Sequence, residues 1–126
     1  MKRRIGMIAA IFSLSMMSVF AVHAVDCKAI SNKLLDNLDQ GNSDAAVVDF
    51  NAEMKAGLSP AQLKQFWQRL PQKLGVRGAR ENARLVQQNG RDIVVTPLHF
   101  STGIANAVVV CSPEGQISGF HVIPQQ

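Results

Sequence analysis

The chain is short, and its charge is nearly balanced outside its first residues. It has 126 residues, with 13 Lys and Arg against 9 Asp and Glu. Three of the basic residues lie at positions 2–4, so 10 basic and 9 acidic residues follow them. This balance argues against a nucleic-acid surface, and the length accommodates one small domain. The remaining basic residues gather somewhat between Arg69 and Arg91, which leaves a local anion-binding patch open.

Residues 1–24 have the pattern of a secretory signal peptide. The basic start MKRR precedes the mostly apolar run IGMIAAIFSLSMMSVFAV, and VHA then offers a cleavage site after Ala24. We therefore expect a periplasmic or secreted protein without stable membrane insertion. The run is nearly long enough to span a bilayer, so a retained anchor is the alternative. Lipid attachment at Cys27 is rejected, because Asp26 stands where a small residue normally precedes the lipidated cysteine.

Two cysteines, Cys27 and Cys111, lie after the predicted cleavage site. In an oxidising compartment an even number of cysteines favours a disulfide, and closing this long loop would contribute about 4 kcal/mol. Two buried free thiols are the alternative, because the geometry that a disulfide needs is not visible in a sequence.

Helical periodicity dominates residues 27–74. The run CKAISNKLLDNL at 27–38 carries an apolar stripe and ends at Gly41, and Asn42 or Ser43 can cap a short run that follows. The clearest helix begins at Pro60, with Ser59 as N-cap and Gln62 as capping-box partner. This helix is expected to face the core with an apolar stripe, which comprises Leu63, Phe66, Trp67, Leu70 and Leu74. We expect Pro71 to kink or end the helix near Leu70.

After Gly78 the period changes to the alternation of strands. Four runs, at 79–88, 91–100, 104–112 and 116–124, are separated by the turns Asn89-Gly90, STG and PEG. Asn-Gly between alternating runs is a strong hairpin signal. Residues 25–126 are therefore predicted to form a single α+β domain, in which two to three N-terminal helices pack on a four-stranded antiparallel meander.

The turns allow the two faces of the sheet to be sorted if no bulge intervenes. We expect Val86 opposite Ile93, His99 opposite Ala105, and Cys111 opposite Ile117. The bulkier face, assigned to the helices, comprises Leu85, Val94, Leu98, Phe100, Ile104, Val108, Val110, Phe120 and Val122. The other comprises Arg84, Val86, Ile93, Val95, His99, Ala105, Ala107, Val109, Cys111, Ile117, Gly119 and His121. This sorting conflicts with the disulfide, because it places Cys111 on the face away from the first helix.

The segment AAVVDFNAEMKAGLSPAQLKQFWQRL, the following LG and the closing PEGQISGFHVIP resemble the domain-of-unknown-function family 3887. The resemblance covers about residues 30 to 124. It implies a small relative of the nuclear-transport-factor-2-like, or cystatin-like, superfamily, with helices on a curved sheet in a cone-like arrangement. It also implies export in many members and supplies no catalytic residue. Fusion to a hydrolase occurs in the family, but this chain has no G-x-S-x-G elbow.

Five residues are candidates for ligand binding, and none is assigned as catalytic. They are Trp67, Phe100, His99, His121 and Arg84. A metal site is not predicted, because Cys111 and His121 would lie roughly 13 Å apart on their strands. No cofactor is implied. Trp67 at helical spacing is more typical of a core residue than of a base-stacking platform.

The function expected from the sequence is therefore a small exported, non-enzymatic domain that binds a ligand or another protein. A homodimer through the Arg84/Val95/Val109/His121 face is the favoured partner, and a separate envelope protein is the other. The alternative is a small acid/base enzyme of the isomerase or dehydratase type. His99, His121, Asp92 and Glu53 would be its candidate groups, but the chain has no tyrosine, a frequent donor to a developing oxyanion. Nucleophilic catalysis by Ser101 or Thr102 beside His99 is not predicted, because no acid is placed to orient this histidine.

Overall fold

A computed structural model describes residues 25–125. These residues form four helices followed by a five-stranded antiparallel sheet, which confirms the predicted α+β class. The predicted signal peptide lies outside the described residues. None of the helices described is long and apolar enough to cross a membrane.

The helices are α1 (Cys27–Asp39), α2 (Ser43–Ala46), α3 (Ala52–Gly57) and α4 (Pro60–Leu74). Each N-terminus is capped by a short polar side chain, and the caps are Asp26, Asn42, Asn51 and Ser59. At α4 the predicted capping box with Gln62 is present in both directions. The caps at Asn42 and Ser59 were predicted from the sequence, whereas those at Asp26 and Asn51 were not.

The helix α4 does not end near Leu70, as one form of the prediction had it, because it continues through Pro71 to Leu74. A proline removes only one backbone donor from a helix, and the carbonyl of Pro71 still accepts a bond from Gly75 N at 2.9 Å. Gly75, at φ +89°, then ends the helix in a conformation that other residues rarely adopt.

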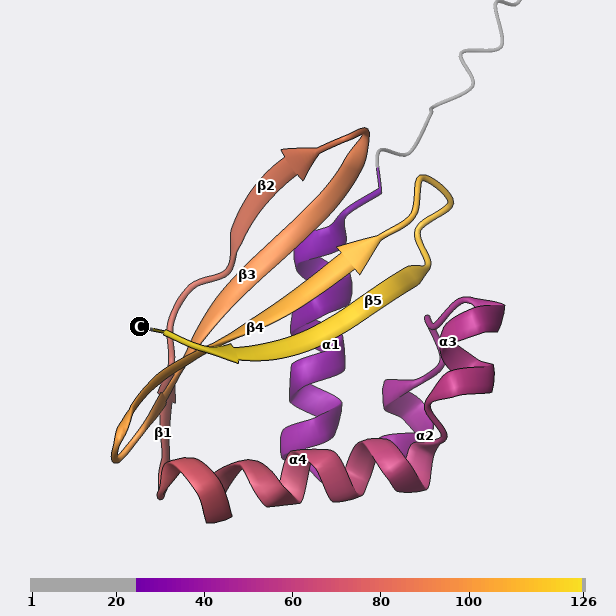
Figure 1. The fold of residues 1–126 in the computed structure, drawn as a ribbon. Coiled ribbons are helices and arrows are strands. Elements are labelled where there is room, and N and C mark those ends of the chain that lie inside the picture. The colour runs from indigo at the N-terminus through magenta and orange to yellow at the C-terminus, as the bar shows by residue number, and fades with distance from the viewer. Residues whose placement is uncertain (1–24, 126) are drawn as a thin grey trace, which may run out of the picture.

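The sheet consists of β1 (Arg77–Arg80), β2 (Arg84–Gln88), β3 (Arg91–Phe100), β4 (Gly103–Cys111) and β5 (Ile117–Pro124). Strand β3 pairs along its length with β4, while β1 and β2 follow one another on its opposite side. β1 was not expected, because RGAR has no apolar alternation and pairs only through an irregular register. α1 passes behind the sheet and α4 runs along one end, so the helices leave one sheet face uncovered (Figure 1).

The register of the β3–β4 hairpin differs by one residue from the prediction. Phe100 pairs with Gly103 across a Ser101-Thr102 loop, so His99 faces Ile104 and not Ala105. The hairpin at Asn89-Gly90 has its predicted register, with both turn residues at positive φ. Cys111 also faces Ile117 as predicted, but a bulge follows, and Val110 then pairs with Gly119.

Because side chains alternate between faces, this one-residue difference reverses the predicted facing of β4. Some residues of β4 and β5 are buried beneath the helices although they were expected to face away from them. They are Ala105, Ala107, Val109, Cys111 and Ile117. Other residues of β4 were expected beneath the helices but lie on the opposite face. They are Ile104, Val108 and Val110.

The corrected register removes the conflict over the disulfide. Cys111 lies on the face covered by the helices and is joined to Cys27 at the start of α1. The bond links positions 84 residues apart and sits within the core. Leu34, Leu35 and Leu63 are completely or almost completely buried against the sheet, and Ser31 and Thr96 are the polar residues buried among the described residues.

Candidate functional site

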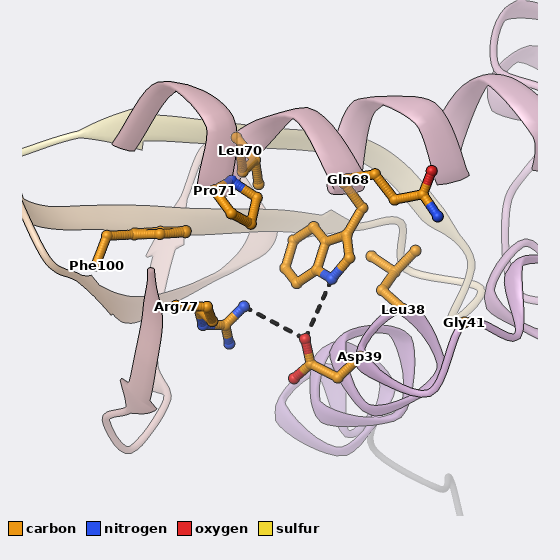
Figure 2. Close-up of a pocket in the computed structure, with 9 residues that line it drawn as sticks. Leu38, Asp39, Gly41, Gln68, Leu70, Pro71, Arg77 and Phe100 are labelled. Carbon is orange, nitrogen blue, oxygen red and sulfur yellow. Dashed lines mark hydrogen bonds and ion pairs between the residues drawn. The ribbon is translucent and has the colours of Figure 1, made fainter. Parts of the chain in front are cut away.

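Two regions on opposite sides of the sheet gather the candidate residues. We call the helix-covered side the inner face and the uncovered side the outer face. At one end of the inner face lies a cavity of about 410 Å³, which we call the Arg77 cavity (Figure 2). Its lining comes from α1 and its exit, α4, β1 and the end of β3: Leu38, Asp39, Gly41, Trp67, Gln68, Leu70, Pro71, Arg77 and Phe100.

The guanidinium of Arg77 lies between two aromatic rings in this cavity. Arg77 is the first residue of β1 and faces Phe100 directly across the strand pair. Its guanidinium carbon is 5.7 Å from the centre of the Phe100 ring and 5.3 Å from the centre of the Trp67 ring. The ring of Phe120 also packs against Trp67, with 6.4 Å between ring centres and a tilt of 40°. The arrangement is a cation–π stack with an aromatic support.

Asp39, the last residue of α1, ties this stack to the helices (Figure 2). Its Oδ1 atom accepts hydrogen bonds from Trp67 Nε1 at 3.2 Å and from Arg77 Nη1 at 3.3 Å. Arg80 Nη1 lies 3.8 Å from Asp39 Oδ2, and Arg80 Nη2 donates to Asp36 Oδ1 at 2.6 Å. One carboxylate therefore orients the indole and a guanidinium together.

The outer face carries a row of residues that crosses four strands. Arg84 pairs with Val95, Val95 with Val108, and Val108 with His121. In the predicted row Val109 stood in the place of Val108, and the register shift is the reason for the difference. Arg84 and His121 lie at opposite ends of the row, three strand spacings or about 14 Å apart, so they do not form one site.

The outer face is largely apolar, with the amide of Asn106 standing among its apolar side chains. Its apolar residues come from β2 to β5 and are Val86, Ile93, Val95, Pro97, Ile104, Val108, Val110 and Ile123. Two of them are notably open, with Val86 40% and Ile123 54% exposed. No helix or strand of residues 25–125 lies over this surface. We call these eight residues the outer apolar patch.

At the edge of the outer apolar patch His99 has an acidic partner that the sequence did not reveal. His99 Nε2 lies 2.8 Å from Glu81 Oε2, and their side chains are 43% and 52% exposed. Glu81 also lines a shallow cavity of about 350 Å³ that includes Arg84, Asn106 and Gln125. The expectation that no acid orients His99 is therefore wrong, because Glu81 comes from the loop after the unexpected strand β1.

The structure brings together two of the five sequence candidates, Trp67 and Phe100, which share the Arg77 cavity. The other three lie on the outer face: His99 beside Glu81, Arg84 at the β2 edge, and His121 exposed on β5.

Sequence reasoning missed Asp39 and Arg77, the two charged groups of the cavity. Asp39 looks like an ordinary helix-end residue, and Arg77 lies in a segment interpreted as the exit from α4. The only signal was the concentration of basic residues after Arg69, which indicated an anion-binding patch without a location.

Comparison with known proteins gives one match. A family model described as "Protein of unknown function (DUF3887)" matches residues 31–120, which include every residue that lines the Arg77 cavity. No curated protein matches the chain. No solved structure matches it.

Proposed function

The chain belongs to the DUF3887 family of proteins of unknown function, and on that premise we propose that it is a binding module, not an enzyme. The module has two binding surfaces. The outer apolar patch pairs with a second copy of the chain, and the Arg77 cavity takes a small ligand. We also propose that the fold is a member of the nuclear-transport-factor-2-like superfamily, since helices covering one face of an antiparallel sheet are compatible with it.

The observation that carries the pairing proposal is a sheet that is apolar on both faces and covered by helices on only one. Contiguous apolar surface of this kind marks an interaction site in soluble proteins. From strand spacing and rise, the patch has a footprint of roughly 400 Å². A standard interface buries about 800 Å² on each partner, with an apolar centre and a polar rim. The patch is thus large enough to be the centre of such an interface.

A second copy is the partner that the rim favours. The rim carries both an acid, Glu81, and a base, Arg84, together with the neutral amide of Gln125, which donates to Asn106 within the patch. A two-fold interface places the same surface on both partners, so a rim of mixed charge can balance itself.

The non-catalytic part of the proposal rests on the dispersal of the candidate acids and bases. Asp92 at the end of β3 accepts a bond from Gln87, and Glu53 lies in the first turn of α3. The side chain of His121 makes no hydrogen bond with residues 25–125, and its backbone belongs to the β4–β5 pair. The acid/base alternative is favoured only by the His99–Glu81 pair. It predicts that His99→Ala abolishes an activity while leaving the fold intact.

Export is part of the same proposal. A disulfide in the core favours an oxidising compartment, in agreement with the signal peptide predicted for residues 1–24.

Sedimentation velocity tests the pairing. We expect the purified protein to sediment as a dimer at tens of micromolar, and Val108→Asp to convert it to a folded monomer. Val48→Asp is the matched control, because Val48 is 59% exposed and lies outside the patch near α2. A wild-type monomer, or a Val48→Asp protein that dissociates as readily as Val108→Asp, would contradict pairing through the outer face.

A further inference from the structure

The charges beside the Arg77 cavity alternate in a chain that ends in a cation. Asp36 bonds to Arg80, Arg80 approaches Asp39, and Asp39 bonds to Arg77. Arg80 is thus flanked by two carboxylates, whereas Arg77 has only one. The last group of this network, on the side of the cavity, is therefore the guanidinium of Arg77.

The same network has more hydrogen-bond donors than acceptors. Arg77 Nε and Arg80 Nη1 are buried without a hydrogen-bond partner among the described residues. Arg77 Nη2 is also without a protein acceptor within residues 25–125, but it is not among the buried atoms. Asp39 Oδ1 already accepts from two donors. Asp39 Oδ2 lies 3.8 Å from Arg80 Nη1, beyond hydrogen-bond length, so the buried donors of Arg77 and Arg80 remain without acceptors in the described part of the chain, which is unfavourable.

The chemistry of the cavity wall selects the rest of the ligand. Beyond the paired charges of Arg77 and Asp39, the wall is formed by the rings of Trp67 and Phe100, by Gly41 and Gln68, and by the apolar side chains of Leu38, Leu70 and Pro71. A cavity of about 410 Å³ lies within the usual range for small-molecule sites, which are mostly apolar with a few convergent polar groups. An aromatic ring suits these walls, because it can pack against the indole of Trp67.

We propose that the Arg77 cavity binds aromatic carboxylates. The carboxylate accepts from the open Nη2 edge of Arg77, which leaves the Asp39 bond intact, and the ring packs against Trp67 and Pro71. A cationic ligand is disfavoured, because Arg77 already occupies the position between Trp67, Phe100 and Asp39. This inference rests on the ligand-binding half of the proposed function and adds to it the sign of the ligand's charge.

The composition of the chain supplies a site-specific probe. Trp67 is the only tryptophan in the sequence, and there is no tyrosine. Intrinsic tryptophan fluorescence therefore reports on this cavity alone. We would titrate the purified protein with benzoate, with its neutral analogue benzamide and with the cation benzylamine, at fixed ionic strength. Calorimetry with the same compounds provides a second measurement that does not depend on the fluorophore.

We expect benzoate to change Trp67 fluorescence saturably and to bind at least about tenfold more tightly than benzamide, a typical loss for one charge-assisted contact. Arg77→Gln should remove this preference, so that benzoate and benzamide bind alike. Arg77→Lys keeps the charge without the planar fork and should keep part of the preference even if Arg77→Gln folds poorly. The matched control is Arg84→Gln on the outer face, which should bind benzoate as the wild type does.

The outcomes separate this inference from the proposed function. If benzamide or benzylamine binds as tightly as benzoate, the cavity binds ligands but the inference about anions is overturned. If Arg84→Gln abolishes the preference as fully as Arg77→Gln, the general charge of the surface is responsible, and the cavity assignment is overturned. If none of the three compounds is bound, both the inference and the ligand-binding half of the proposed function fail. Sedimentation decides the pairing half independently.

Discussion

Val94 and Val95 are neighbours on β3, yet they belong to different surroundings. Val94 is completely buried in the core beneath the helices, whereas Val95 stands in the outer apolar patch. The same contrast recurs on β4, where Val109 is buried and Val108 is not. The two faces are thus alike in residue type and differ in what covers them. We infer that the inner face maintains the fold and that the outer face is kept apolar for a partner.

The strongest way to break this comparison is to place a charge on each face of β4. Val109→Asp would bury a carboxylate without a partner, which should cost about 5 kcal/mol and abolish the folded state of so small a domain. Val108→Asp should cost less than about 1 kcal/mol in the monomer. Circular dichroism and urea unfolding compare the two variants. The opposite order would mean that β4 has the register expected from its sequence.

Removing the disulfide tests the same register in another way. Replacing Cys27 and Cys111 by serine should lower the free energy of unfolding by about 4 kcal/mol, because the bond closes a loop of 84 residues. Urea unfolding with and without a reducing agent measures the loss. Peptide mapping of the unreduced protein checks that the bond is intact, and a free thiol at Cys111 would contradict its place on the inner face.

A gentler comparison uses the adjacent valines of β3. Val94→Ala should lower the free energy of unfolding by about 2 kcal/mol, since it removes two buried methyl groups and leaves a cavity. Val95→Ala should change the stability of the monomer by less than about 1 kcal/mol but weaken the dimer. Thermal unfolding and sedimentation read the two effects separately. Equal losses of monomer stability would show that an element of the chain covers both faces.

The smallest expected effect concerns a hydroxyl on the inner face. Thr96 is completely buried, and its Oγ1 atom has no hydrogen-bond partner among the described residues. Thr96→Val should therefore raise the free energy of unfolding by about 1 kcal/mol. Thr102→Val is the control, because Thr102 Oγ1 donates to Leu74 O at 2.7 Å and its loss should destabilise by about 1 kcal/mol. Destabilisation by Thr96→Val in urea unfolding would indicate that its hydroxyl has a partner.

The elements with local signals were predictable from the sequence. The capping box at Ser59, the turn at Asn89-Gly90 and the helical stripe of α4 each depend on residues a few positions apart. The faces of the sheet were not predictable, because they depend on whether Gly103 belongs to the turn or to the strand. That choice of one residue reverses the facing of all seven apolar positions of β4 that were assigned to a face, and alternation alone cannot decide it when both faces are apolar.

The residues of the candidate sites were likewise predictable only where a local pattern pointed to them. Trp67 and Phe100 were recognisable as large aromatic residues on predicted elements, and they share the cavity. Asp39, Arg77 and Glu81 were not recognisable, because each acquires its partner from a distant part of the chain. Trp67 and Asp39 are 28 positions apart, and Arg77 and Asp39 are 38 apart. These contacts between side chains require the packing of α1 against α4 and β1, which no local sequence pattern encodes.

The pairing of Cys27 with Cys111 also bears on how the protein matures. They are the only cysteines of the chain, so only one bond within a molecule is possible. Oxidation therefore needs no later reshuffling of wrongly paired bonds, the slow step of many cysteine-rich proteins. Cys27 is synthesised 84 residues before its partner, and until then it can react only with another molecule. The competing product of maturation is thus a cross-linked pair of chains and not a misfolded monomer.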